Sequence, residues 1–529
     1  MLATIDLVVV ALYGIAIFAL AQWVSREKAG HAKNSADYFL ASKALPWWAI
    51  GTSLIAANIS AEQIVGMSGS GYAVGLAIAS YEWLAAATLL IVGKYFLPIF
   101  LANRIYTMPQ FLEQRYGRLL PVLMALFWLA LYIFVNLTSI LWLGAIAVNR
   151  VAGLDQDWAL VLLGLFALFY QLYGGLKAVA FTDVVQVTLL VLGGLVIAYL
   201  TLTHVSGGAG PIAGFQTLMR RVPDHFDMIL AADNPFYRDL PGVGVLVGGL
   251  WVANLSYWGF NQYIIQRALA ARSLAEAQKG VVFAAYLKLL MPVIIVLPGI
   301  AAVVLAPGLA KPDQAYPTMM ALLPPGLLGL VFAALVAAII ASTASKINSI
   351  ATIFTLDLYA KARGWRSDAE SGAPGRHEAH LVLVGRGVAA LAVVVALLAA
   401  RPLLGGADQA FQFIQEFSGF FTPGITVIFL LGLFWRKASE AGAIAAAVAS
   451  VLLSYALKLA APDLPFLNRM ALVFLAALAL AVIVSLARPA GGATNRVTMA
   501  GVSFRTPPAF NIAGLGIVLI LIALYAAFW

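Results

Sequence analysis

The chain has 529 residues, of which 63% are hydrophobic and only 10% are charged. A soluble protein of this length needs roughly 25% charged residues to cover its surface, so this composition excludes an ordinary water-soluble protein and indicates a chain that faces lipid. The chain contains no cysteine, which excludes disulfides and thiol catalysis. The net charge of +9 comes from short loops between apolar stretches, and this placement favours membrane topology over nucleic-acid binding.

Apolar segments of membrane-spanning length follow one another along the whole chain. A spanning helix needs about 20 mostly apolar residues, and fourteen segments approach that length. Their continuous hydrophobicity predicts helices rather than alternating membrane strands. No small-residue cleavage pattern follows the first segment, so we interpret it as a retained helix rather than a signal peptide. The segments are 5–23, 46–75, 78–101, 119–148, 157–172, 178–202, 242–265, 280–305, 326–359, 381–400, 410–435, 441–459, 471–486 and 512–528.

Lysine and arginine are distributed unequally between the loops on the two sides of the predicted membrane. If the N-terminus is outside, the cytoplasmic loops contain 21 of these residues and the external loops contain 8. Cytoplasmic loops of membrane proteins are enriched in basic residues. The distribution therefore predicts that both termini are external.

Two segments contain polar residues where a lipid-facing helix would be apolar. Segment 46–75 carries Asn-Ile-Ser-Ala-Glu-Gln at 58–63, and segment 242–265 carries Asn-Leu-Ser-Tyr-Trp-Gly-Phe-Asn-Gln at 254–262. Both contain the string Ala-Asn-x-Ser. Unwound backbone at mid-membrane depth is tolerated only where it lines a cavity in the protein. We therefore expect both helices to be interrupted beside a cavity.

The positions of these interruptions suggest an internal repeat. If segments two to six and seven to eleven are two five-helix repeats, the interruptions fall on the first helix of each. An odd number of helices makes the two halves inverted, and paired interruptions point to the binding site of a transporter. The predicted organisation is an extra helix and loop at 1–45, a first repeat at 46–204, an external loop at 205–240, an inverted repeat at 241–436 and three peripheral helices at 437–529.

Two ionisable residues lie well inside apolar segments, namely Glu82 and Lys288. Such residues are costly in a membrane and usually functional. The structural alternative is an ion pair, or a side chain that extends to the membrane interface. A binding role and a structural role both remain open from the residues alone.

Several long strings resemble the sodium/solute symporter family, and within it the bacterial sodium/galactose (sodium/glucose) branch. The likeness runs along nearly the whole chain. It implies an all-α polytopic membrane protein of about 14 transmembrane helices with a LeuT-like five-plus-five inverted-repeat core. The strings are DYFLASKALPWWAIGTSLIAANISAEQIVGMSGSGYAVGLAIASYEW, NLTSILWLGAIA, YGGLKAVAFTDVVQV, GGLWVANLSYWGFNQYIIQRALAA and NSIATIFTLDLY.

The resemblance also implies a function, which is symport of a neutral hexose with sodium across the bacterial cytoplasmic (inner) membrane. Sodium is then a co-transported ion, and the partners are the sugar, sodium and the lipid bilayer, with no nucleic acid. A neutral sugar needs donors and acceptors around its edge and an aromatic ring on one face. The implied sugar-binding residues are Gln63, Glu82, Asn254, Lys288, Gln415 and Tyr257.

The same resemblance assigns gates on the two sides of the sugar. Met67, Tyr81 and Phe411 match an outer lid, Tyr257 matches an inner gate, and Asn58 matches the residue that braces this tyrosine. The alternative for the amides among the sugar-binding residues is hydrogen bonding between helices. Ala85 stands where close relatives have a serine that contacts the sugar, so the preferred epimer stays open.

For sodium, the resemblance implies the carbonyls of Ala56, Ile59 and Ala338 and the hydroxyl of Ser342. Carbonyl oxygens of unwound helix suit this ion without burying further charge. The alternative for Ser342 is a hydroxyl bonded to its own helix. Ala341 replaces a second hydroxyl ligand, which leaves lower sodium affinity or proton coupling open. Asp183 matches an acidic residue on the cation exit path, with a charge at a helix terminus as the alternative.

Four other functions compete with this hypothesis. A related symporter for an amino acid, carboxylate or polyol is the first, although an ionised substrate would need a counter-charge. A channel or uniporter would lack a lid and a cation site. A membrane enzyme is disfavoured because the chain has five histidines, no cysteine and no recognisable nucleophile motif. A sensor would need a further domain, for which we expect no room after the last helix.

Overall fold

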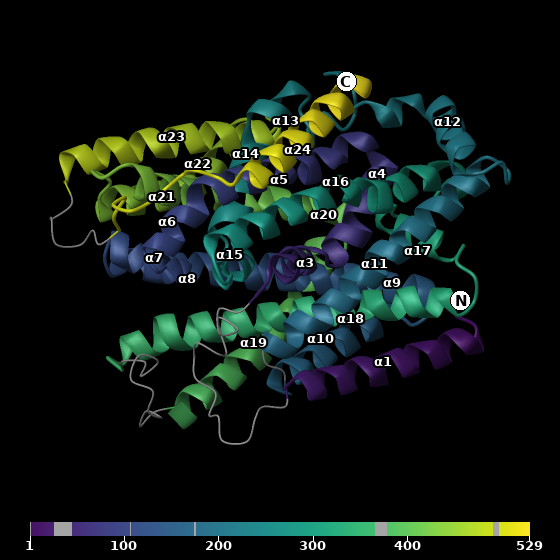
Figure 1. Ribbon diagram of the computed structural model, residues 1–529, viewed down its shortest axis with the longest axis horizontal. Coiled ribbons are helices and arrows are strands. Elements are labelled where there is room, and N and C mark those ends of the chain that lie inside the picture. The colour runs from purple at the N-terminus through teal and green to yellow at the C-terminus, as the bar shows by residue number, and fades with distance from the viewer. Residues whose placement is uncertain (1, 26–44, 106, 174–175, 366–377, 490–496) are drawn as a thin grey trace.

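The computed structural model describes residues 2–25, 45–105, 107–173, 176–365, 378–489 and 497–529. Within these ranges the chain forms helices and no β-strand, apart from an isolated bridge between Leu45 and Ala271. Most of the long helices run along the long axis of the molecule, which is horizontal in Figure 1. The all-α prediction is confirmed.

All fourteen apolar segments are helical in the structure. In the first half of the chain, several segments combine two or more helices because short π-helical or 3₁₀ turns interrupt them. The elements are α1 (Thr4–Ser25); α3 (Trp47–Asn58), η2 (Glu62–Gly66) and α4 (Met67–Ala73); η3 (Leu76–Ala79), α5 (Ser80–Ile91), η4 (Val92–Phe96) and α6 (Leu97–Ala102); α7 (Met108–Arg115); α8 (Leu119–Ala130), η5 (Leu131–Leu137) and α9 (Thr138–Ala152); α10 (Gln156–Tyr173); and α11 (Leu176–Val205).

The second half continues in the same way after a region of short helices. These are α12 (Pro211–Arg221) and η6 (Pro223–Phe226) in the predicted external loop. The remaining elements are α13 (Val243–Val247), α14 (Gly249–Leu255), η7 (Ser256–Phe260) and α15 (Gln262–Leu269); α16 (Leu274–Leu305); η8 (Pro312–Gln314) and α17 (Ala315–Met320); α18 (Leu327–Thr352) and η9 (Ile353–Ala360); α19 (Glu378–Leu404); α20 (Ala410–Ser418) and α21 (Thr422–Phe434); α22 (Glu440–Ala460); α23 (Phe466–Ala487); and α24 (Pro508–Ala527).

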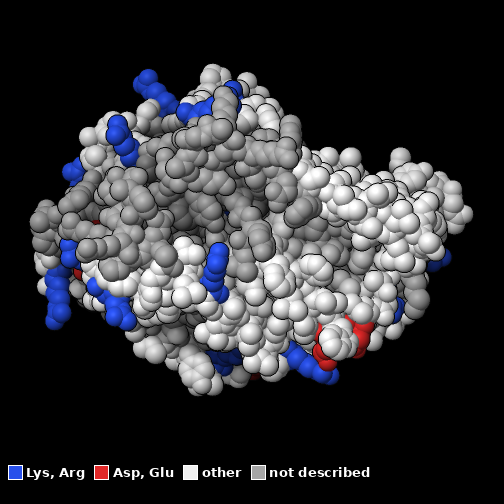
Figure 2. Space-filling view, turned by 90° about the horizontal axis from the view of Figure 1, so that it is seen from below, with Lys and Arg blue, Asp and Glu red and all other residues white. Residues whose placement is uncertain are grey.

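Nine helices of the described ranges are long and apolar enough to cross a membrane, or ten if α20 and α21, which meet at a 48° bend, form one span. The other segments are shorter or broken, so fourteen crossings and external termini stay predictions. Lysine and arginine side chains gather mainly toward the left end of the molecule in Figure 2, the end that carries α7 in Figure 1. This is the end that the loop charges predict to be cytoplasmic.

Both predicted helix interruptions are present. Helix α3 ends at Asn58, and Ile59 has extended backbone with φ −69° and ψ 104°. In the second broken segment, the π-helical turn η7 leads into Asn261, which has φ −82° and ψ 117°. Extended residues between helical turns leave backbone groups outside the regular hydrogen-bond pattern. Both broken helices therefore offer backbone groups that a ligand can bind.

Helix α16 lies against both halves of the first broken segment, α3 and α4, and also against α5 and α11. Glycines permit this close approach. A Cβ atom at Gly51 would lie 2.8 Å from the carbonyl oxygen of Gly280, and one at Gly299 would lie 2.2 Å from the carbonyl oxygen of Ser68. This packing places Lys288, in the middle of α16, beside the interruption. The predicted repeat and domain boundaries remain predictions.

Candidate transport site

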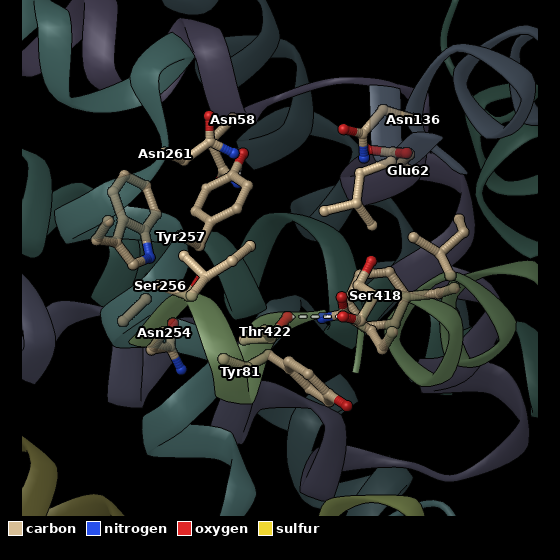
Figure 3. A pocket seen from close by; sticks show the side chains of 18 of the residues that line it. Asn58, Glu62, Tyr81, Asn136, Asn254, Ser256, Tyr257, Asn261, Ser418 and Thr422 are labelled. Carbon is tan, nitrogen blue, oxygen red and sulfur yellow. Dashed lines mark hydrogen bonds between the residues drawn. The ribbon is translucent and has the colours of Figure 1, made fainter. Parts of the chain in front are cut away.

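A cavity lies between the two broken segments in the middle of the bundle. Polar side chains reach it from η2, η5, α14 and α20, and Figure 3 shows several of them facing the same space. Its other walls are aromatic and aliphatic. The lining residues are Asn58, Glu62, Gln63, Tyr81, Glu82, Ala85, Trp128, Leu131, Tyr132, Asn136, Ala253, Asn254, Ser256, Tyr257, Trp258, Phe260, Asn261, Lys288, Phe411, Ile414, Gln415, Ser418, Thr422, Ile425, Phe466, Leu467 and Met470.

One wall of the cavity is a bonded cluster around Lys288. Its Nζ lies 2.5 Å from Oε2 of Glu82 and also donates to Oδ1 of Asn58. The other oxygen of Glu82 accepts from Nε2 of Gln63 at 3.2 Å. Lys288 and Glu82 are buried, and a buried ion pair tolerates loss of one partner poorly. The cluster therefore combines an ion pair with the side-chain amides of Gln63 and Asn58, which can hydrogen-bond a polar substrate.

On the predicted outer side, the cavity is closed mainly by aromatic contact. The rings of Tyr81 and Phe411 meet edge to face, with centroids 5.2 Å apart. Met67, the third residue that the resemblance assigns to the lid, is fully buried and does not line the cavity. The hydroxyl of Tyr81 has no hydrogen-bond partner within the described part of the chain. This closure therefore depends on packing.

A buried carboxyl supports the same outer side. Asp313, in the connection between α16 and α17, accepts a hydrogen bond from the Ala410 N–H at 3.2 Å. Its other oxygen has no partner among the described residues. Burial raises the pKa of Asp313 to about 7, against smaller opposing effects of the Ala410 N–H and Lys311. Since Ala410 precedes Phe411, this carboxyl holds the start of the helix that carries the lid.

On the predicted inner side, hydrogen bonds contribute to the closure. Nδ2 of Asn58 donates to the hydroxyl of Tyr257 at 3.2 Å, and Figure 3 shows these two side chains together. The hydroxyl of Tyr132 donates to Oδ1 of Asn261 at 2.8 Å. Below them, Nε of Arg267 donates to the hydroxyl of Ser53 at 2.9 Å. Each bond joins one broken segment to another element, so opening this side requires that they break.

Beside the first interruption, backbone oxygens are free for a ligand. The last hydrogen bond of α3 runs from the Ile59 N–H to the Ile55 carbonyl. In the described structure, no backbone N–H bonds the carbonyls of Ala56 or Ile59. Ala338 and Ser342 lie four residues apart on α18 and therefore share a face. Helix α11 packs against both α3 and α18.

Comparison with known proteins identifies the architecture. The model of the sodium:solute symporter family matches residues 38–450. The chain belongs to this family.

Two curated proteins resemble the chain over most of its length. A sodium/glucose cotransporter of Vibrio parahaemolyticus is 49% identical over 546 aligned residues, covering 100% of this chain and 99% of that protein. The human sodium/myo-inositol cotransporter 2 is 33% identical, covering 85% of this chain and 69% of that protein.

Solved structures support the same fold. A Na+-coupled sialic acid symporter in a substrate-bound outward-open state has a TM-score of 0.76 at 23% identity, covering 92% of this chain and 99% of that one. A nucleobase-cation-symport-1 family transporter in a closed conformation has a TM-score of 0.55 at 14% identity, covering 88% and 98%. The expected LeuT-like transporter architecture is therefore confirmed, and the chain is a multi-span membrane symporter rather than an enzyme.

The structure brings the implied sugar-binding residues of the family together. Gln63, Glu82, Asn254, Lys288, Gln415 and Tyr257 all line the cavity, as does Ala85. Glu82 and Lys288 also form the ion pair that was the structural alternative. Asn254 donates to the Leu250 carbonyl of its own helix at 3.1 Å, which leaves its oxygen and one N–H for a substrate. Their roles in binding stay predictions.

Other cavity residues were not singled out from the sequence. Glu62 lies in the polar string after the first interruption, and it accepts a hydrogen bond from the hydroxyl of Ser139. Asn136 lies beside Glu62 in Figure 3. Both residues lie in the sequence strings that resemble the family. Residue spacing, however, does not show which face of an interrupted helix a side chain occupies. The side chain of Asp183 lies outside the described residues, and its predicted role on the exit path stays open.

Proposed function

We propose that this protein imports a neutral monosaccharide, a galactose- or glucose-like hexose, together with sodium across the bacterial cytoplasmic membrane by alternating access. The observation that carries the proposal is the position of one polar cavity against both helix interruptions. Glu82, Lys288 and Gln63 line the cavity, and the unbonded carbonyls of Ala56 and Ile59 follow directly on α3. The similarity to a sodium/glucose cotransporter supports the same substrates.

The chemistry of the cavity suits an uncharged polyhydroxy compound. Lys288 and Glu82 neutralise each other, so this pair offers no net charge to an ionised substrate. Hydroxyl groups both donate and accept hydrogen bonds. They can therefore share the Glu82 oxygens, the Gln63 amide and the Asn254 oxygen, while Tyr257 offers a ring face. The relatives named sodium/myo-inositol cotransporters support a polyol as the second candidate substrate.

In the proposed cycle, sodium enters first from outside and joins α3 to α18 through Ala56, Ile59, Ala338 and Ser342. This favours the outward-open form and completes the sugar site. The hexose then bridges the two repeats, the Tyr81–Phe411 closure forms over it, and Tyr257 later moves away on the inner side. Ion and sugar are released to the cytoplasm.

The sodium gradient supplies enough free energy for accumulation. A tenfold gradient provides about 1.4 kcal/mol, and a potential of 100 mV adds about 2.3 kcal/mol per charge. Together they give roughly 3.7 kcal/mol per ion, which corresponds to a sugar gradient of several hundred-fold. One coupled ion is therefore sufficient.

The test is uptake of labelled galactose, glucose and myo-inositol into proteoliposomes that contain the purified protein. With inward sodium and potential gradients, we expect hexose accumulation above the external concentration. Replacing sodium by choline should abolish this accumulation. Equal uptake in the two solutions would refute sodium coupling, and preferred uptake of myo-inositol would replace the hexose by the polyol.

A further inference from the structure

A second buried lysine, Lys346, lies deep in the bundle and has no part in the proposed sugar site. Its side chain is 3% exposed. Ala338, Ser342 and Lys346 are spaced by four residues on α18. Residues at this spacing lie above one another on a single helix face. Lys346 therefore lies on the same face of α18 as the two proposed sodium ligands, one helical turn beyond Ser342.

Aromatic faces and one neutral amide hold this ammonium group. Nζ lies 4.2 Å from the ring centre of Tyr263 and 5.2 Å from that of Tyr132. It donates to Oδ1 of Asn136 at 3.3 Å. Aromatic rings attract a cation but do not accept its proton. By contrast, Lys288 contacts the carboxylate of Glu82 directly at 2.5 Å, so Lys346 is the less firmly held of the two cations.

Besides its burial, Lys346 is affected by two charged side chains. Glu62, from η2, attracts its ammonium, and Arg267, from α15, repels it. Glu62 follows the proposed sodium ligand Ile59 by three residues, and Lys346 follows the proposed ligand Ser342 by four. Lys346 therefore has one carboxylate and one other cation, Arg267, in its surroundings. A sodium ion at Ser342 would be a third cation, and like charges a helical turn apart in a protein interior repel strongly.

Other titratable groups on the elements packed around α18 are engaged elsewhere or lie on the surface. Tyr132 and Tyr263 are the ring partners already named, and the side chain of Asp183 on α11 lies outside the described residues. The remaining described groups are Asp6 of α1, bonded to Gly326 and Gly329; Arg150 of α9, bonded to Thr318; Asp157 of α10, paired with Arg401 of α19; Asp357 of η9, paired with Lys361; Tyr359 of η9, bonded to His380 of α19; and Tyr170 of α10, beside Tyr13. Arg386 of α19 and Tyr199 and His204 of α11 are exposed.

We propose that Lys346 is a tethered cation that competes with sodium, so that sodium binds as Lys346 releases a proton. The inference rests on the proposed sodium coupling and deepens it. In the step, one N–H bond of the ammonium breaks, the electron pair stays on Nζ, and the proton passes to water. Sodium then takes over the attraction of Glu62. Ala341 makes this competition important, because a site with one fewer hydroxyl ligand holds sodium less strongly against the repulsion.

Two measurable consequences follow for the purified protein. Sodium should bind more tightly as pH rises, since a neutral Lys346 no longer repels it. Sodium binding in weakly buffered solution should also release protons, because linkage requires that an ion favoured by deprotonation drives deprotonation. A lysine that only packs against aromatic rings would produce neither effect.

The experiment measures binding of radiolabelled sodium and proton release with an indicator dye. From about pH 6 to about pH 10, we expect the sodium affinity of the unmodified protein to rise about tenfold as Lys346 loses its proton. Lys346→Met should bind sodium tightly at every pH, and Lys346→Arg, which stays charged, should bind weakly at every pH. Neither variant should release protons.

Lys94→Met is the matched control, since Lys94 also lies over a tyrosine ring, that of Tyr95 at 5.5 Å, but in η4. It should behave like the unmodified protein. The inference is overturned if Lys346→Met or Lys346→Arg keeps the pH dependence and proton release of the unmodified protein, or if the unmodified protein binds sodium equally at every pH. If Lys346→Met does not fold, Lys346→Arg alone decides. Absence of sodium binding at every pH would instead refute the proposed sodium coupling itself.

Discussion

The outer and inner sides of the cavity are closed by different kinds of contact. On the outer side, Tyr81 and Phe411 meet through their rings, and Asp313 leaves one carboxyl oxygen without a partner in the described structure. On the inner side, hydrogen bonds join Asn58 to Tyr257 and Tyr132 to Asn261. Ring contacts need no fixed pair of atoms, whereas each hydrogen bond joins two specific atoms and is lost once they separate. Without ligands, the outer side should therefore open more readily than the inner side.

This comparison can be measured because the chain contains no cysteine. A single Ala253→Cys substitution places one thiol in the cavity wall. A membrane-impermeant thiol reagent added to the outside of oriented vesicles then reports outer opening, and the same reagent inside reports inner opening. The variants below are made in this background.

Lys288→Met should have the largest effect, since Lys288 joins the sugar site to the inner closure through Glu82 and Asn58. Removing one partner of a buried ion pair costs about 3–5 kcal/mol. We expect hexose uptake to fall by at least about a hundredfold and inner labelling to rise. In the double variant Glu82→Gln/Lys288→Met, thermal stability should recover while uptake stays lost. Normal uptake by the single variant would remove Lys288 from the site.

Phe411→Ala tests the outer closure. Truncating a buried phenylalanine costs about 3–5 kcal/mol, and part of this loss falls on the closed state alone. Outer labelling should therefore rise on the order of thirtyfold, with inner labelling unchanged. Phe411→Leu, which keeps most of the volume, should have a smaller effect in the same direction. Equal increases on both sides would show that Phe411 supports the whole bundle rather than one gate.

The pH dependence of outer opening follows from Asp313. Its pKa is raised to about 7 by burial, above the ordinary value, so the protonated carboxyl stabilises the closed outer side. This stabilisation is present at low pH and is lost as pH rises through about 7. Between about pH 6 and about pH 8, outer labelling should rise by up to about tenfold. Asp313→Asn should remove the dependence, and an unchanged profile in this variant would exclude Asp313 as its source.

Tyr257→Phe should give the smallest change, because it deletes one hydroxyl that accepts from Asn58. A buried hydrogen bond contributes about 0.5–1.5 kcal/mol net. Inner labelling should therefore rise about fivefold, while the outer rate stays as in the parent protein. If outer labelling rises instead, the bond does not belong to the inner closure.

The sequence predicted best the features that depend on neighbouring residues in the chain. Continuous apolar runs predicted the helices, and polar residues at mid-segment predicted the interruptions now seen at Ile59 and Asn261. Contacts across the bundle could not be read in this way. The orientation of Glu62 after an extended residue, the rings around Lys346 and the burial of Asp313 depend on how distant segments pack. Met67, implied as part of the lid, is fully buried and does not line the cavity.

The most direct test asks whether one cavity holds ion and sugar together. Galactose affinity of the purified protein is measured in sodium and in choline, and sodium affinity with and without galactose. We expect each ligand to tighten the other by the same factor, about tenfold or more, since coupling between two sites is reciprocal. If each affinity is indifferent to the other ligand, the two broken helices do not bind ion and hexose jointly.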